Sequence, residues 1–247
     1  MKLSCVIPVL NSHEVVRRQI LHWSRLQYPA GEVEFIILDD GSDPPLWFTV
    51  AALPPLLNLS IIPTNDSRPW TWAVARNRGA GAAVGEYLLM TDIDHIITQQ
   101  CLDAALNFAQ DKLRFHREFG VLDENGHVTQ DLAVLRQHGL PEARIAKRGV
   151  KLTALRNNFC MRRDLFLKLG GYREDLIGKA YPAGEDRYWA YRWHVARREG
   201  LVQEATCAQP TLLMFPNGYY VGDVDADPQG LFHKLSRKSE RNPKHHA

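Results

Sequence analysis

Two aspartates that follow a short apolar run are the residues of this chain best suited to chemistry. The apolar residues 87–90 predict a buried strand that ends at Asp92, with Asp94 two positions further on. Side chains two apart on an extended backbone share a face, so both carboxylates could bind one hard cation such as Mg²⁺ or Mn²⁺. The alternative is that Asp92 and Asp94 cap a following helix, because Asp is common at helix starts.

The composition of the 247 residues is that of a globular protein with one large core. A formal net charge of +2 makes no case for nucleic acid as a partner. Four cysteines without a Cys-x-x-Cys pair predict buried thiols in a reducing compartment. We find no signal-peptide pattern and no apolar run of spanning length, so we expect a cytoplasmic protein without a transmembrane segment. The cysteines are Cys5, Cys101, Cys160 and Cys207.

The first hundred residues alternate between strand and helix patterns, which predicts an α/β fold with a mostly parallel sheet and helices on both faces. Ligands bind at the carboxyl ends of such strands. Polar residues fall at three of those ends, which predicts one crevice lined by Asn11, Asp39, Asp40, Asp92 and Asp94. The predicted strands are residues 3–9, 33–38, 59–62 and 87–92, and the predicted helices are 13–27, 46–53 and 72–84.

Beyond about residue 98 the alternation weakens, and a smaller region of sheet and helix is expected. We find no linker, so residues 1–247 are predicted to form one domain, with a first half at 1–97, a second half at 98–230 and a basic tail at 231–247. The second half is predicted to hold a hairpin turn at 123–127, a polar connection at 136–149, strands at 158–163, 210–216 and 218–221, and helices at 164–169 and 184–198.

Six short motifs, in this order and spacing, resemble the inverting nucleotide-sugar glycosyltransferases of family 2, which have the GT-A fold. The resemblance spans most of the chain, and no single motif is decisive by itself. The motifs are Val6-Ile7-Pro8-Val9-Leu10-Asn11, Asp39-Asp40-Gly41-Ser42, Ala75-Arg76-Asn77-Arg78-Gly79-Ala80, Gly85-Glu86-Tyr87 before Asp92-Ile93-Asp94, Phe159 to Asp164 with Gly170-Gly171-Tyr172, and Gly184-Glu185-Asp186.

The resemblance implies a nucleoside diphosphate sugar as donor and a Mn²⁺ or Mg²⁺ cofactor. Asp94 of the Asp-x-Asp motif would bind the cation, and Asp92 would contact the ribose or a water on the metal. Asp40 would accept a ring N–H of the base, which favours UDP but also admits GDP and dTDP. Alternatively, Asp40 closes the turn before Gly41, a role that Asp39 could equally fill. The implied donor-binding residues are Pro8, Val9, Asn11, Asp40, Arg76, Asn77 and Asp92.

The resemblance also implies that Asp186 is the general base of a single-displacement transfer with inversion. Such a base deprotonates the acceptor hydroxyl as it attacks the anomeric carbon. Its predicted place in the first turn of a helix suits a carboxylate, although acidic residues are ordinary there. His233 would be a further metal ligand, as a C-terminal histidine is in some GT-A enzymes. A surface histidine is the alternative.

Three further expectations concern the substrates. Arg76 and Arg78 are two apart on a predicted helix, so at most one should point toward a diphosphate. The basic tail could contact the donor, an acceptor phosphate or an anionic membrane surface, or it could be a solvated end. The acceptor would be a glycan, a lipid-linked molecule or another hydroxyl compound, as in glycan or glycoconjugate biosynthesis.

Two departures from the family pattern limit the resemblance, and two other functions stay open. Leu10 stands where relatives often have Tyr, and a Gln-x-x-Arg-Trp signature is absent, which argues for non-processive addition of one sugar. The run ending in Asp92-Ile93-Asp94 also resembles the motif of haloacid dehalogenase-like phosphatases, in which Asp92 would be the nucleophile. A nucleotide-sugar-binding module without turnover is the non-enzymatic alternative.

Overall fold

The structure is a computed structural model that describes residues 1–51, 53, 58–68, 71–140, 142–152, 157–177 and 184–216. The predicted strand 218–221, His233 and the basic tail lie outside these residues.

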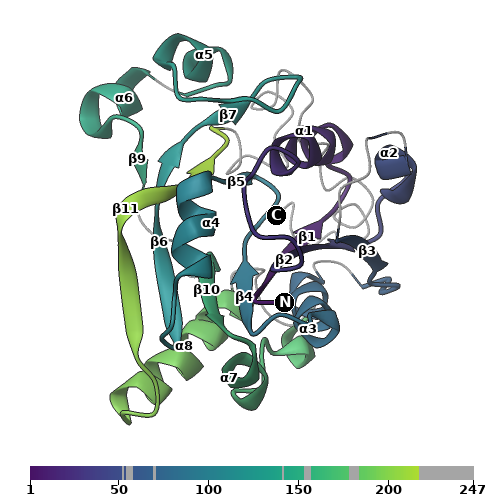
Figure 1. The fold of residues 1–247 in the computed structure, drawn as a ribbon, viewed down its shortest axis with the longest axis vertical. Coiled ribbons are helices and arrows are strands. Elements are labelled where there is room, and N and C mark those ends of the chain that lie inside the picture. Colours follow the sequence, from purple (N-terminus) through teal and green to yellow (C-terminus); the bar gives the residue numbers. More distant parts are fainter. Residues whose placement is uncertain are drawn as a thin grey trace, which may run out of the picture.

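The central sheet has parallel order on one side and mixed order on the other (Figure 1). β1 (Leu3–Val9) lies between β2 (Val33–Asp39) and β4 (Tyr87–Met90), and β3 (Leu59–Pro63) is next to β2, all four parallel. β10 (Phe159–Arg162) is antiparallel to β4 and to β6 (Lys112–Phe119). β11 (Glu204–Met214) runs parallel to β6, while β5 (His95–Ile97) is antiparallel to β11 and β9 (Lys151–Leu152) to β6. The predicted α/β sheet is confirmed, and its antiparallel strands come after β4.

The predicted helices of the first half are confirmed, with ends a few residues earlier. They are α1 (His13–Trp23), α2 (Trp47–Ala51) and α3 (Trp72–Ala82), followed by α4 (Gln99–Leu106). In the second half α7 (Arg163–Lys168) ends before Gly170 and Gly171, both at positive φ, and α8 (Gly184–Arg198) has the predicted bounds. A short 3₁₀ helix, η1, spans Glu174–Leu176.

The polar connection predicted at 136–149 is wrong, because two short helices occupy that region. α5 (Leu132–Gln137) is capped by Asp131, whose carboxylate accepts from two backbone N–H groups of the first turn, and it buries Leu135. α6 (Glu142–Arg148) follows. Helices of six or seven residues are too short to show an apolar period in the sequence. They lie at the same end of the molecule as the predicted hairpin, β7 (Val121–Leu122) and β8 (Val128–Thr129) (Figure 1).

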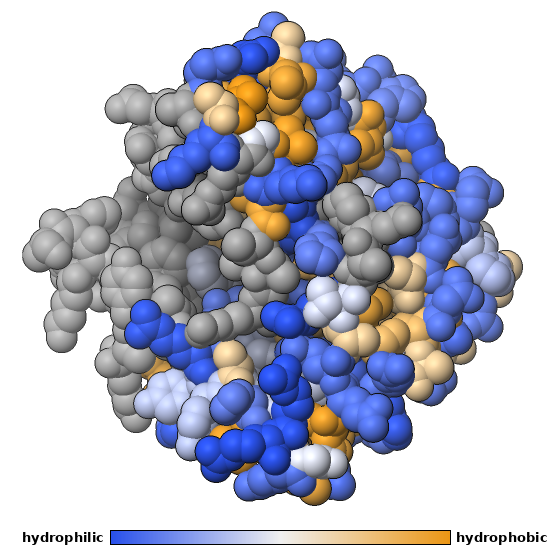
Figure 2. Space-filling model, turned by 90° about the vertical axis from the view of Figure 1, so that its left-hand side faces the viewer, coloured by the Kyte–Doolittle hydropathy of each residue, from blue (hydrophilic) through white to orange (hydrophobic). Residues whose placement is uncertain are grey.

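The two faces of the sheet are buried by different helices. Alternate residues of β1, such as Cys5 and Ile7, belong to the apolar cluster that includes α1 and α4, whereas Val6 belongs to the cluster of α3, α7 and α8. The described surface in Figure 2 is mainly hydrophilic, with hydrophobic residues in separate small patches. The apolar residues are therefore concentrated in two layers on either side of the sheet.

The buried face of α1 also carries polar side chains that bind the segments after β4. Gln19, fully buried, donates through Nε2 to the carbonyls of Ile93 (3.0 Å) and His95 (2.8 Å). His22 Nε2 lies 2.8 Å from the carbonyl of Ile97. Because buried polar groups need partners, these contacts fix α1 and residues 93–97 to each other.

Gly79 allows α3 to approach the sheet closely, and an alanine there should destabilise the fold. A Cβ at Gly79 would lie 2.4 Å from Val6 Cγ1 and 2.8 Å from Leu38 Cδ2. We expect Gly79→Ala to lower the free energy of unfolding by about 1 to 3 kcal/mol in urea denaturation. The control is Gly81→Ala on the same helix, where a Cβ meets no atom within 4 Å, and no loss of stability is expected. Equal stability of both variants would contradict the close packing.

His22 should make the stability of the fold depend on pH below neutrality. Burial lowers the pKa of His22 from its ordinary value of 6.5. As the pH falls below about 6.5, the unfolded chain binds the proton first, so the stability falls until the pH reaches the folded pKa. Urea denaturation between pH 8 and 5 should show a weaker pH dependence in His22→Gln. The exposed His127→Gln variant should keep the parent's dependence, and an unchanged slope in His22→Gln would contradict the assignment.

Candidate active site

Asp92 and Asp94 lie in the turn between β4 and β5, not on a strand. β4 ends at Met90, so the prediction that an extended backbone places both carboxylates on one face is wrong. The turn nevertheless brings them together, because single ligand atoms of Asp92, Asp94 and His95 lie within 4.8 Å of one another. The helix-cap alternative is also wrong, since α4 is capped by Thr98, which accepts from the N–H of Cys101 at 3.1 Å.

The main chain of this turn is fixed by three different elements. The N–H of His95 donates to the carbonyl of Asp92 at 3.0 Å, and the N–H of Phe215, just after β11, donates to the carbonyl of Asp94 at 3.0 Å. Gln19 of α1 binds the carbonyl of Ile93 between them. The two carboxylates therefore project from a backbone that is held on both sides.

Asp92 is surrounded by charged groups from separate elements. Arg76 of α3 forms an ion pair with its carboxylate, and Arg76 is only 1% exposed. Burial raises the pKa of Asp92, the positive charge of Arg76 opposes that rise, and the charges of Asp94 and Asp186 add to it. Asp186, in the first turn of α8, thus lies close enough to interact electrostatically with Asp92. Of the predicted metal-binding and base residues, Asp92 thus lies next to Asp94 and within electrostatic range of Asp186, whereas His233 is outside the described residues.

His95 was not predicted as a site residue, although it directly follows Asp94. Its Nδ1 lies 2.6 Å from Asp94 Oδ1, and its Nε2 lies 2.8 Å from Arg117 Nη1. Both His95 and Arg117 are buried. Arg117 comes from the middle of β6, and no motif marks it in the sequence.

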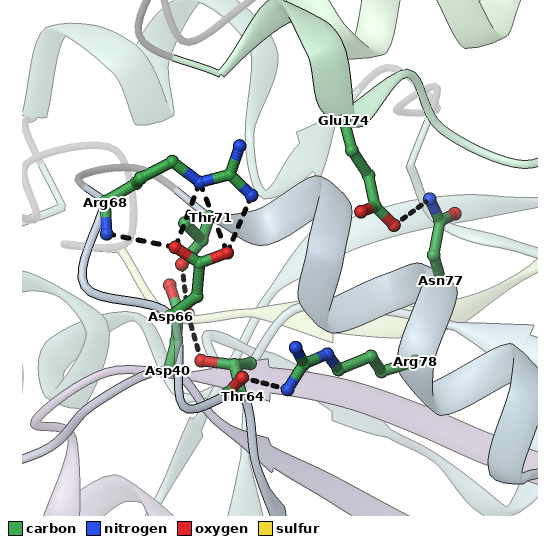
Figure 3. A network of polar contacts seen from close by, with 8 residues as sticks. All are labelled: Asp40, Thr64, Asp66, Arg68, Thr71, Asn77, Arg78 and Glu174. Carbon is green, nitrogen blue, oxygen red and sulfur yellow. Dashed lines mark hydrogen bonds and ion pairs between the residues drawn. The ribbon is translucent and has the colours of Figure 1, made fainter.

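The predicted nucleotide end of the site lies where β1 and β2 end. Asp39 closes the turn, accepting from the N–H groups of Ser42 (2.8 Å) and Leu46 (3.0 Å). Asp40 instead accepts from the hydroxyls of Thr64 (2.9 Å) and Thr71 (Figure 3). Of the two alternatives for closing the turn, the structure therefore selects Asp39.

Asn11 ties the end of β1 to the same turn. It has a φ of 53°, a left-handed conformation that asparagine tolerates better than most residues. Its N–H donates to Ser42 Oγ at 2.9 Å and its Oδ1 accepts from the N–H of Asp43 at 2.8 Å. The carbonyl of Val9 accepts from the N–H of Asp40 at 2.8 Å, and Pro8 is the buried residue before Val9. Pro8, Val9, Asn11 and Asp40 therefore lie close together.

The three polar residues of the α3 motif point to different partners. Arg76 binds Asp92, whereas Arg78 donates to the carbonyl of Thr64 (Figure 3), so the two arginines point in different directions, as their spacing on the helix predicts. Asn77 donates through Nδ2 to the carbonyl of Tyr172 (2.8 Å) and accepts from its N–H through Oδ1 (2.9 Å). It also donates to Glu174, as Figure 3 shows, so its amide holds the segment after α7.

Two further predictions concern the cysteines and the absence of a transmembrane segment. Cys5, Cys101 and Cys160 are buried free thiols, as predicted, and the side chain of Cys207 is outside the described part. Among the described residues, none of the helices combines the length and the apolar character that crossing a membrane requires.

Comparison with known proteins identifies the family. Residues 4–188 match the sequence model described as "Glycosyltransferase like family 2", which is most of the chain. No curated protein sequence matches the chain. The family match supports a transferase over the phosphatase alternative.

Solved structures show the same fold at low identity. Staphylococcus aureus TarS (residues 1–349) superposes with a TM-score of 0.59 at 18% identity, over 89% of this chain and 62% of that one. The same fragment in complex with UDP superposes with a TM-score of 0.59 at 20% identity, over 89% of this chain and 62% of that one. The mannosyltransferase PcManGT from Pyrobaculum calidifontis, in complex with GDP-Man and Mn²⁺, superposes with a TM-score of 0.57 at 18% identity, over 87% of this chain and 56% of that one. The chain thus spans less than two thirds of the length of these proteins.

By the extent of its sequence match, the chain belongs to the glycosyltransferase family 2-like proteins, and its fold is that of the GT-A glycosyltransferases.

Proposed function

We propose that this glycosyltransferase uses Mn²⁺ or Mg²⁺ to transfer one sugar from a nucleoside diphosphate sugar, with UDP favoured, to an acceptor hydroxyl with inversion and without processivity. The observation that carries the proposal is the gathering of Asp92, Asp94 and Asp186 around the end of β4, next to Arg76. Carboxylate oxygens are the ligands that Mg²⁺ and Mn²⁺ prefer.

Asp94, with Asp92 beside it, fits a divalent cation. Arg76 offsets one negative charge of the pair, so a net negative charge is left for a metal ion. The chemistry of such a cation is to stabilise the charge that develops on the leaving diphosphate. PcManGT, which has the same fold, holds Mn²⁺ together with GDP-Man. His233, as a further ligand, stays a proposal from the sequence.

The base of the donor nucleotide would bind where β1 and β2 end. A carboxylate has about four lone-pair sites, so the hydroxyls of Thr64 and Thr71 can orient Asp40 while it accepts a ring N–H. The backbone of Pro8 and Val9 and the turn held by Asn11 would form the wall of this site. Asn77 would act indirectly, by holding the main chain of Tyr172. UDP is favoured by analogy with TarS, and GDP is the main alternative.

Asp186 would accept the proton of the acceptor hydroxyl. Its carboxylate comes from the first turn of α8 and acts electrostatically on Asp92, so it would lie near the proposed cation, where a base that acts on the acceptor hydroxyl is needed. Residues 1–97 would then bind the donor, and residues 98–230 would bind the acceptor, which would be a glycan, a lipid-linked molecule or another hydroxyl compound. A cytoplasmic location and membrane contact through the basic tail are parts of this proposal.

The donor and the metal can be tested together by calorimetry with UDP-, GDP-, dTDP- and CMP-sugars. We expect one nucleotide class to bind with Mn²⁺, and EDTA to weaken that binding about tenfold or more, because Asp94 would hold the cation that offsets the charge of the diphosphate. Asp94→Asn should weaken the Mn²⁺-dependent binding by roughly 10- to 100-fold. The surface variant Asp103→Asn on α4 is the control and should bind as the parent does. A folded parent that binds none of the four sugars would contradict the proposal.

The general base can be tested with Asp186→Asn and the donor that calorimetry selects. Release of the nucleoside diphosphate, measured with a panel of glycoside acceptors, should fall by about 10² to 10⁴ when the base is removed. Donor binding should stay within about twofold, since the base acts on the acceptor. Glu199→Gln, just after α8, is the control and should not change turnover. Parent-like turnover in Asp186→Asn would exclude Asp186 as the base, and a folded parent without any turnover would favour the binding module.

A further inference from the structure

A chain of three side chains connects the proposed metal ligand Asp94 to the interior of the sheet. Asp94 Oδ1 lies 2.6 Å from His95 Nδ1, and His95 Nε2 lies 2.8 Å from Arg117 Nη1. His95 is 2% exposed and Arg117 is 1% exposed, so water does not compete for these contacts. Short, buried hydrogen bonds of this kind hold side chains in one orientation.

The chemistry of the three groups fixes where the imidazole proton lies. A guanidinium can only donate, so His95 Nε2 must be the acceptor from Arg117. The ring proton is then on Nδ1, which donates to the carboxylate of Asp94. Both ring nitrogens are therefore engaged with protein groups, and His95 has no lone pair to offer a cation, although it lies within 4.8 Å of Asp92 and Asp94.

Arg117 occupies a position at which the strand pattern calls for an apolar residue. Along β6, Leu113, Phe115 and Phe119 are buried on the same face, and Arg117 is the charged member of that series. Burying a charge is costly unless it is hydrogen-bonded. Arg117 also donates to Met214 Sδ (3.2 Å) on β11, but His95 is the partner that leads toward the site.

The main chain and the side chain of Asp94 are held by different groups. Phe215 and Gln19 bind carbonyls of the turn, which fixes the backbone. The orientation of the Asp94 carboxylate depends on the side-chain contact with His95. A carboxylate can accept this hydrogen bond and still bind a cation through its remaining lone pairs.

We propose that Arg117 and His95 are positioning residues that orient Asp94 for the divalent cation, and that His95 is not a metal ligand. This inference rests on the proposed function. Groups that hydrogen-bond to metal ligands typically change metal affinity by about 10- to 100-fold when they are removed. The effect of Arg117 should reach the metal only through His95.

Two variants of His95 separate a positioning role from a ligand role. The amide nitrogen of Asn can replace the Nδ1–H donor, but Asn has no acceptor at the Nε2 position for Arg117, so His95→Asn should bind Mn²⁺, with UDP or the diphosphate that calorimetry selects, about 3- to 10-fold more weakly than the parent. The Oε1 of Gln can accept from Arg117, but it leaves no donor at the Nδ1 position. His95→Gln should therefore bind Mn²⁺ about 10- to 100-fold more weakly. A similar loss in both variants would show that the imidazole itself binds the metal and would overturn the inference.

The role of Arg117 can be tested by the same Mn²⁺ titration, in which electron paramagnetic resonance measures the concentration of free Mn²⁺. Arg117→Met should weaken Mn²⁺ binding about 10- to 100-fold, and Arg117→Lys, which restores one donor, should recover part of it. The control is Leu113→Ala on the same face of β6, which should lower stability without changing Mn²⁺ affinity. If Leu113→Ala weakens Mn²⁺ binding as much as Arg117→Met does, the effect is general destabilisation and the inference fails.

A measurement without metal makes the result independent of the proposed function. In the parent labelled with ¹⁵N-histidine, nuclear magnetic resonance should show the proton of His95 on Nδ1, with the signal assigned from its loss in His95→Gln. A proton on Nε2 instead would overturn the inference even if the protein binds Mn²⁺. A parent with the Nδ1 proton that binds no Mn²⁺ would overturn the proposed function, and the metal-positioning role with it.

Discussion

The site depends on one constraint, the parallel pairing of β1 with both β2 and β4. The connection from β1 to β2 runs through α1 on one face of the sheet, and the connection from β3 to β4 runs through α3 on the other face. The two connections diverge where these strands end, and open α/β sheets bind their ligands at such a point. β1 also holds both site turns directly, because Val9 accepts from the N–H of Asp40 and Val6 from that of Thr91. Displacing β1 would therefore disturb the turns that carry Asp40 and Asp92 together.

The first half of the fold could be predicted from the sequence because each element there has a clear period and is separated from the next by turn residues. The Asp92–Asp94 segment was misassigned as strand for a physical reason. Its apolar neighbours favour an extended chain, while the contacts that hold the turn come from Gln19 of α1 and from Phe215 after β11, far away in the sequence. The short helices α5 and α6 were missed because six or seven residues are too few to show an apolar period.

The site residues divide in a similar way. Asp92, Asp94, Asp186 and Arg76 could be found because motifs mark them, but their partners could not. Thr64 and Thr71 become partners of Asp40 only through the packing of β3 and α3 against β2. For Arg117 the sequence does contain a signal, a charged residue in the apolar phase of an alternating strand. Asn77 lies in a motif, yet its amide binds the main chain of Tyr172.

The balance of charge at the end of β4 gives a physical reason for the contact of Asp94 with an imidazole. Two ionised carboxylates with oxygens within 4.8 Å of each other repel by on the order of 3 kcal/mol or more at an effective dielectric constant of about 20. Arg76 compensates Asp92, while the contact of Asp94 with His95 adds no positive charge if the ring proton lies on Nδ1. A cationic partner would neutralise the negative charge of the Asp94 carboxylate, which a metal ion needs for binding. In the proposed site, a neutral donor held by a buried arginine would orient the carboxylate and leave its charge available, so the cost of keeping Asp92 and Asp94 close would be recovered on binding of a divalent cation.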